Sequence, residues 1–103
     1  MKDKEKIEKD LPRVYNLVIK HLPGHHFPTS AAVDLGQLKS ELEKALLDML
    51  NHDFERLLQL MYLVDVPQQA FEEAMKEGSI KSIAARLAEL LIHREWQKTR
   101  FRQ

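Results

Sequence analysis

Apolar residues recur at intervals of three and four along almost the whole chain, and this spacing constrains the fold more than any other feature. Residues three and four apart share one face of an α-helix, whereas a half-buried strand requires strict alternation. Strict alternation never runs for five residues or more, and Val and Ile are sparse. The pattern therefore predicts an all-α fold, a compact bundle of about five helices with a long C-terminal helix.

Two helices are predicted in the first half of the chain. The first carries its apolar residues within 11–22, with Asp10 as its N-cap, and the charged residues before it form a separate helical turn or a frayed end. A turn-rich stretch follows at 23–30. The second helix runs from near Asp34 to about Asn51 and has one apolar and one charged face.

Two more helices are predicted before the last one. The third, over 53–64, begins at Asp53 as N-cap and is apolar on most sides, which is typical of a helix in the centre of a core. Asp65 and Gln68 fit a capping box at the start of a short fourth helix, which ends near Glu77. The packing order of the helices stays open, since up–down and orthogonal arrangements fit equally well.

The last helix is predicted to be long. Gly78 suits the left-handed position after a helix end, and Ser79 caps a helix that runs to near Phe101. About 22 residues span about 33 Å at 1.5 Å each. A compact domain of this size has a diameter of about 33 Å. The C-terminal turns are therefore expected to reach or pass the edge of the fold.

Length and charge set the class of protein. The chain has 103 residues, which fits one helical domain over 1–103. Lys and Arg number 16 and so do Asp and Glu, so no global basic field for nucleic acid exists. The stretch 53–77 carries six acids against two bases, and 78–103 carries six bases against two acids. These stretches face each other within one chain, or favour a symmetric dimer between chains.

The chain contains no cysteine, which excludes disulfides, thiolate catalysis and cysteine-ligated zinc. No apolar run approaches the ~20 residues of a membrane span, and the charged N-terminus leads into no signal-peptide core. We therefore expect a cytoplasmic protein with no membrane partner.

The common catalytic and nucleotide-binding motifs are missing. The sequence contains no GxSxG, GxGxxG or GxxxxGK[ST] pattern. The adjacent Glu72 and Glu73 point about 100° apart on a helix, so they do not converge on one substrate. We predict that the chain is not an enzyme and uses no cofactor.

Three histidines cluster around the turn-rich stretch: His21, His25 and His26. Imidazole is a common metal ligand, and His21 and His25 are close enough in sequence to approach one ion. However, the spacing matches no zinc signature, and the adjacent His25 and His26 cannot easily aim at one metal. Solvent-exposed loop histidines are the main interpretation, and a small metal-binding protein using this cluster is an alternative.

The basic, aromatic C-terminus provides the sharpest functional hypothesis. Arg94, Lys98 and Arg102 are four residues apart and share one helix face. Trp96 and Phe101 could fill a partner's pocket or stack on bases. The simpler interpretation is a solvated helix end with Trp96 folded onto the core. We predict these five residues as a partner-binding surface for another protein or a second copy of the chain.

A nucleic-acid-binding accessory protein using the same basic helix is the other alternative. The C-terminal helix offers only a few basic side chains for phosphate contacts, and the chain as a whole has no net positive charge. A helix-turn-helix interpretation of 53–77 is opposed by Glu72 and Glu73, which repel phosphate. Nucleic acid is therefore the less favoured partner.

Four segments, 51–62, 64–66, 87–91 and 94–98, resemble in combination small bacterial all-helical proteins to which no function is attached. The resemblance covers about half the chain, from His52 to Arg102. It implies an all-helical fold and brings no activity, cofactor or site residue with it. We predict a non-enzymatic protein-interaction or regulatory domain, with a homodimer as one form.

Overall fold

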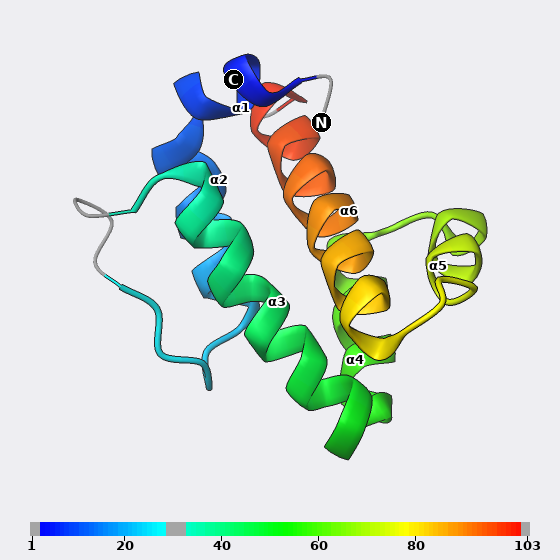
Figure 1. Cartoon of the computed structure of the whole chain (residues 1–103). Helices are drawn as coiled ribbons and strands as arrows, with labels where there is room; N and C mark the ends of the chain where they lie inside the picture. Colours follow the sequence, from blue (N-terminus) through cyan, green and yellow to red (C-terminus); the bar gives the residue numbers. More distant parts are fainter. Residues whose placement is uncertain (1–2, 29–32, 102–103) are drawn as a thin grey trace.

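The computed structural model describes residues 3–28 and 33–101, which form helices and no strand (Figure 1). This confirms the all-α prediction, with one short helix more than the predicted number because the charged N-terminal stretch forms a helix of its own. None of the helices in these two ranges is long and apolar enough to cross a membrane. The helices are α1 (Lys4–Lys9), α2 (Leu11–His21), α3 (Leu35–His52), α4 (Phe54–Val64), α5 (Gln68–Ala74) and α6 (Ile80–Phe101).

The central element is α6, and the prediction that the third helix is central is wrong. α6 packs against α2, α3, α4 and α5, and α3 and α6 lie side by side through the middle of the molecule (Figure 1). α4 buries only one ordinary helical stripe, Leu57, Leu60, Met61 and Val64. Its remaining apolar side chains face water. α4 is thus apolar on most sides but is buried on only one of them.

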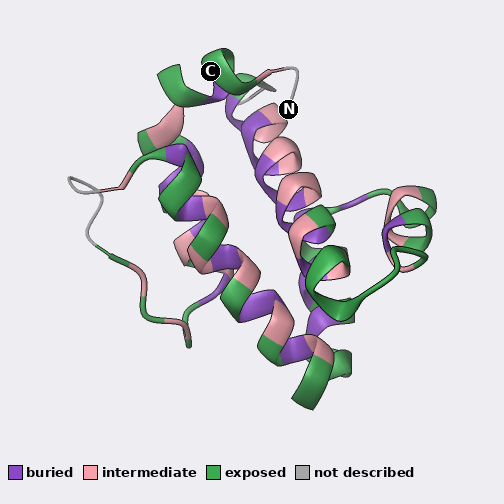
Figure 2. Cartoon of the chain, in the orientation of Figure 1, coloured by how far each residue is buried: buried purple, intermediate pink, exposed green. Residues whose placement is uncertain are grey.

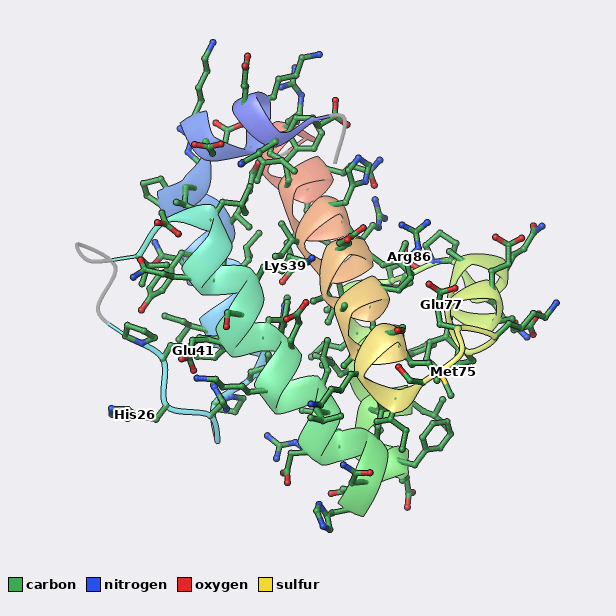
Figure 3. All side chains as sticks on the ribbon, viewed as in Figure 1. His26, Lys39, Glu41, Met75, Glu77 and Arg86 are labelled. Atoms are coloured by element: carbon green, nitrogen blue, oxygen red, sulfur yellow. The ribbon has the colours of Figure 1, made fainter. Side chains whose placement is uncertain are left out.

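The core lies between α3 and α6 and is closed by α2 and α4. Figure 2 shows the buried residues as stripes along the facing sides of α3 and α6. Polar contacts border this seam, since Lys39 Nζ of α3 lies 3.2 Å from Glu89 Oε1 of α6 (Figure 3). The fully buried side chains of the two helices include Leu38, Leu42, Leu46, Leu87 and Ile92.

Three helix starts follow local capping signals. Asp34 and Gln37 form a reciprocal capping box at the start of α3. Asp53 Oδ1 accepts a hydrogen bond from the backbone N–H of Arg56, and Ser79 Oγ accepts one from the backbone N–H of Ser82. The predicted caps at Asp53 and Ser79 are confirmed.

Other local predictions are wrong, because tertiary contacts or backbone geometry override the sequence signal. Asp10 precedes α2 but makes no side-chain cap, since its carboxylate binds Trp96 instead. Asp65 ends α4 in the left-handed conformation, at φ 65°, and does not cap α5. Gly78 does not have a positive φ, and α5 already ends at Ala74.

The last helix has the predicted length, 22 residues. At about 1.5 Å per residue its length is about 33 Å, close to the 32 Å of the longest dimension of the described part of the chain, so it reaches the edge of the fold. α1 lies beside the C-terminal turns of α6 and covers them (Figure 1). Trp96 and Thr99, in these turns, are therefore buried.

Candidate interaction surface

Trp96, the predicted partner-facing aromatic residue, is part of the core. It is 6% exposed, and its Nε1 donates a hydrogen bond to Asp10 Oδ2 at 2.9 Å. The guanidinium of Arg100 lies over the indole ring, 5.2 Å from its centroid, which is a cation–π distance. The contacts of Trp96 join the start of α2 to the end of α6.

Arg94 and Lys98 tie α6 to the end of α4. Arg94 Nε donates to the carbonyl oxygen of Asp65, and Nη2 donates to Asp65 Oδ2, both at 2.9 Å. Lys98 Nζ donates to the carbonyl oxygen of Leu63 at 3.4 Å. Both cations thus neutralise the carbonyl end of α4, where the helix dipole favours positive charge.

The side chains of the other two predicted residues lie outside the described part of the chain. Phe101 is the last residue of α6, with its side chain outside the described part, and Arg102 lies outside the described residues. Partner binding by Arg94, Trp96, Lys98, Phe101 and Arg102 stays a prediction. The first three of them already have partners within the chain.

The histidines of the predicted cluster turn to different partners. His21 Nδ1 donates to Glu95 Oε2 at 2.6 Å, and His25 Nε2 donates to Glu41 Oε2 at 3.2 Å. His26 is exposed in the loop (Figure 3). Within residues 3–28 and 33–101, no three His, Asp or Glu side chains are grouped so that they could hold a metal ion.

The most unusual surface feature lies on α4. Phe54, Leu58, Tyr62 and Leu63 point outward and are 43%, 44%, 89% and 56% exposed. The first three are four residues apart, so they form one stripe along the helix. We call these four side chains the α4 surface.

The α4 surface has the size of the largest apolar patches on typical monomers. Large apolar side chains present roughly 150–250 Å² each, so the exposed fractions correspond to on the order of 400 Å². Patches of about 300–600 Å² are the largest found on typical monomers and are often functional. The core is filled without these side chains, so their exposure is not required by the fold.

The charge on α4 balances. Glu55 and Arg56 are its charged residues, one of each sign. The sequence signal for the α4 surface is the high apolar content of 54–64, where eight of the eleven residues are apolar. This content predicts a core helix, because periodicity does not distinguish a helix buried on all sides from one with a docking face.

No family model, curated protein or solved structure matches this chain. The resemblance to small bacterial helical proteins therefore stays an expectation. The function proposed below is therefore based on the geometry of the chain itself.

Proposed function

We propose that this chain is a non-enzymatic protein-interaction domain whose docking site is the α4 surface, and that the occupant is a second copy of the chain. The observation that carries the proposal is the outward stripe of Phe54, Leu58 and Tyr62. Keeping such side chains in water costs about 25 cal/mol per Å² relative to burial. Pairing would recover that free energy.

The geometry of the stripe is self-complementary. In a symmetric dimer the same patch is used on both copies, so residue i contacts j and j contacts i. With a two-fold axis beside Leu58 and the two helices antiparallel, Leu58 meets Leu58 of the second copy. Phe54 of each copy then meets Tyr62 of the other. The equal spacing of the three residues satisfies all these contacts at once.

Electrostatics favours a second copy over other occupants. α4 carries one charge of each sign and the whole chain has zero net charge, so two copies approach without repulsion. An anionic lipid surface or a nucleic acid is bound through an excess of positive charge, which α4 lacks.

The area sets the expected affinity. About 400 Å² per copy gives an interface near 800 Å², below the 1,200–2,000 Å² of stable complexes. The dimer is therefore expected to be weak, with a fast exchange between monomer and dimer.

Sedimentation analysis across concentration tests the proposal. The 12.1 kDa wild-type chain should shift toward twice its monomer mass as concentration rises through the micromolar range. Leu58→Glu places a charge at the centre of the α4 surface and should remain monomeric with unchanged helix content. Ser40→Glu, which adds the same charge to an exposed site on α3, should self-associate like the wild type.

Two results would overturn the proposal. A wild type that stays monomeric up to about 1 mM would exclude a second copy as the occupant. Self-association that is equal in Leu58→Glu and the wild type would place the interface elsewhere on the chain.

A further inference from the structure

A hollow of about 250 Å³ lies where the loop after α2 crosses α3 and the first turn of α4. Its rim contains Gly24, His25, Lys44 and Arg56, and its floor includes the apolar side chains of Ala45 and Met49. The loop and Glu41 of α3, which stands next to the rim, are visible at the same side of the molecule in Figure 3. The hollow does not include any side chain of the α4 surface.

Arg56 has an unusual position at this rim. Its guanidinium lies against Gly24, since a Cβ at Gly24 would be 3.1 Å from Arg56 Nη2. In the described part of the chain its guanidinium makes neither a hydrogen bond nor an ion pair. Arg56 also lies in the first turn of α4, where the helix dipole disfavours a cation. A bound anion would give the guanidinium a partner and would offset the unfavourable interaction of Arg56 with the helix dipole.

Lys44 and His25 are held at the same rim by one carboxylate. Glu41 Oε1 accepts from Lys44 Nζ at 3.1 Å, and Glu41 Oε2 accepts from His25 Nε2 at 3.2 Å. These two hydrogen bonds hold the pKa of Glu41 below its usual value, and the bond from Lys44 has the larger effect. Glu41 therefore stays ionised and positions both side chains, while Lys44 keeps two further N–H donors.

One carboxylate belongs to the lining itself. Asp48 Oδ1 accepts from His52 Nδ1 at 3.2 Å, and Asp48 is exposed, so its charge is well solvated. Among the lining residues two permanent cations, Lys44 and Arg56, oppose this one acid. The lining itself thus carries one more positive than negative charge, Glu41 beside it offsets the charge of Lys44, and Arg56 is the cation left without an ion pair among the described residues.

We infer that this hollow binds the phosphate group of a small organic phosphate. The planar guanidinium of Arg56 matches two phosphate oxygens, and Lys44 adds a compact positive charge. Ala45 and Met49 provide an apolar floor for the organic part. The volume lies below the ~300–1,000 Å³ of pockets for drug-sized ligands, so the ligand is small.

The probes are phenyl phosphate and inorganic phosphate, added to the wild-type chain and followed by amide chemical shifts in NMR. Saturable shifts should centre on Gly24, His25, Lys44 and Arg56, with a dissociation constant of about 1 mM or below. Phenyl phosphate should bind more tightly than inorganic phosphate because its ring covers Met49. Phenol, which lacks the phosphate, should not bind.

Two variants disturb the site in different ways. Arg56→Gln keeps the backbone N–H that Asp53 caps and removes the guanidinium. Affinity should fall by about tenfold or more, the loss expected for a charged hydrogen bond. Gly24→Ala suits the backbone, since no glycine of the described residues has a positive φ, but its Cβ would lie 3.1 Å from Arg56 Nη2, so the guanidinium would have to shift slightly. It should weaken binding by less than Arg56→Gln does.

Arg86→Gln is the matched control, because Arg86 is an exposed arginine on α6, on the other side of the molecule from the loop (Figure 3). It should bind both probes as the wild type does. The inference is overturned if no saturable shift occurs up to about 10 mM probe. It is also overturned if Arg56→Gln and Gly24→Ala retain wild-type affinity, or if Arg86→Gln loses as much affinity as they do.

Discussion

Glu95 of α6 accepts a hydrogen bond from His21 Nδ1 of α2 at 2.6 Å, although Glu95 is only 1% exposed. The other carboxylate oxygen, Oε1, makes no hydrogen bond within the described part of the chain and lies 3.7 Å from Lys98 Nζ. A cavity of about 10 Å³ adjoins the pair, room for about one water molecule. The carboxylate therefore depends on His21 and Lys98 for its place in the core.

Removing His21 is expected to destabilise the fold strongly. His21→Ala leaves the Glu95 carboxylate buried with only Lys98 near it, and breaking a buried pair from one side costs about 3–5 kcal/mol. Urea denaturation should show a loss near the lower end of this range, because Lys98 remains. A loss of less than about 1 kcal/mol would mean that the pair is not desolvated.

Replacing both partners is expected to be far milder. The double variant His21→Leu/Glu95→Leu removes the buried charge and fills the same space with apolar groups, which is often neutral or stabilising. Its free energy of unfolding should lie within about 1 kcal/mol of the wild-type value or above it. A double variant as unstable as His21→Ala would contradict this account.

Trp96 is expected to act as a core residue in any stability measurement. Trp96→Ala removes a buried indole and its hydrogen bond to Asp10, so the free energy of unfolding should fall by about 3–5 kcal/mol. Arg100→Ala removes only the exposed cation over the ring and should cost at most about 1 kcal/mol. Equal, small effects of both changes on thermal unfolding would place Trp96 outside the core.

Asp65 is expected to tolerate glycine better than valine. Its φ of 65° is left-handed, and Arg94 binds its backbone carbonyl as well as its carboxylate. Asp65→Gly keeps the carbonyl contact and relaxes the backbone, so stability should change by less than about 1 kcal/mol. Asp65→Val should cost about 1–3 kcal/mol. Equal unfolding midpoints in urea would show that the turn is not left-handed.

Glu41 is expected to give an acid-dependent contribution to stability. Its pKa is lowered in the folded protein by Lys44 and then His25, so its contribution is fully present above the ordinary value of 4.5. This contribution is lost as pH falls through the lower folded pKa. The difference in unfolding free energy between wild type and Glu41→Gln should therefore shrink in acid. A pH-independent difference for Glu41→Gln would contradict the pairing.

Signals carried by a few neighbouring residues predicted much of the fold. The length of α6 and the caps at Asp53 and Ser79 follow from spacing and side-chain chemistry within one helical turn. Contacts between distant segments could not be predicted in this way. Trp96 and Asp10 are 86 positions apart, and no local pattern indicates that α1 covers the end of α6.

The candidate sites were the least predictable part. Phe54, Leu58 and Tyr62 read as core residues, because periodicity shows which side chains share a face but not which face meets a neighbour. Arg56 carried no sequence signal either, since its place in the hollow depends on a loop 32 residues earlier in the chain, at Gly24. Both features required the packing of helices to be known.

Disulfide formation by a single cysteine at position 58 tests the central claim most directly. The chain has no cysteine, so Leu58→Cys and the control Ser40→Cys each carry one thiol. In an antiparallel pair about Leu58 the two thiols come within the short distance that a disulfide requires. Under mild oxidation Leu58→Cys should form covalent dimers at least about tenfold faster than Ser40→Cys, and denaturant should abolish the difference. Equal rates for the two variants in the folded state would contradict pairing through the α4 surface.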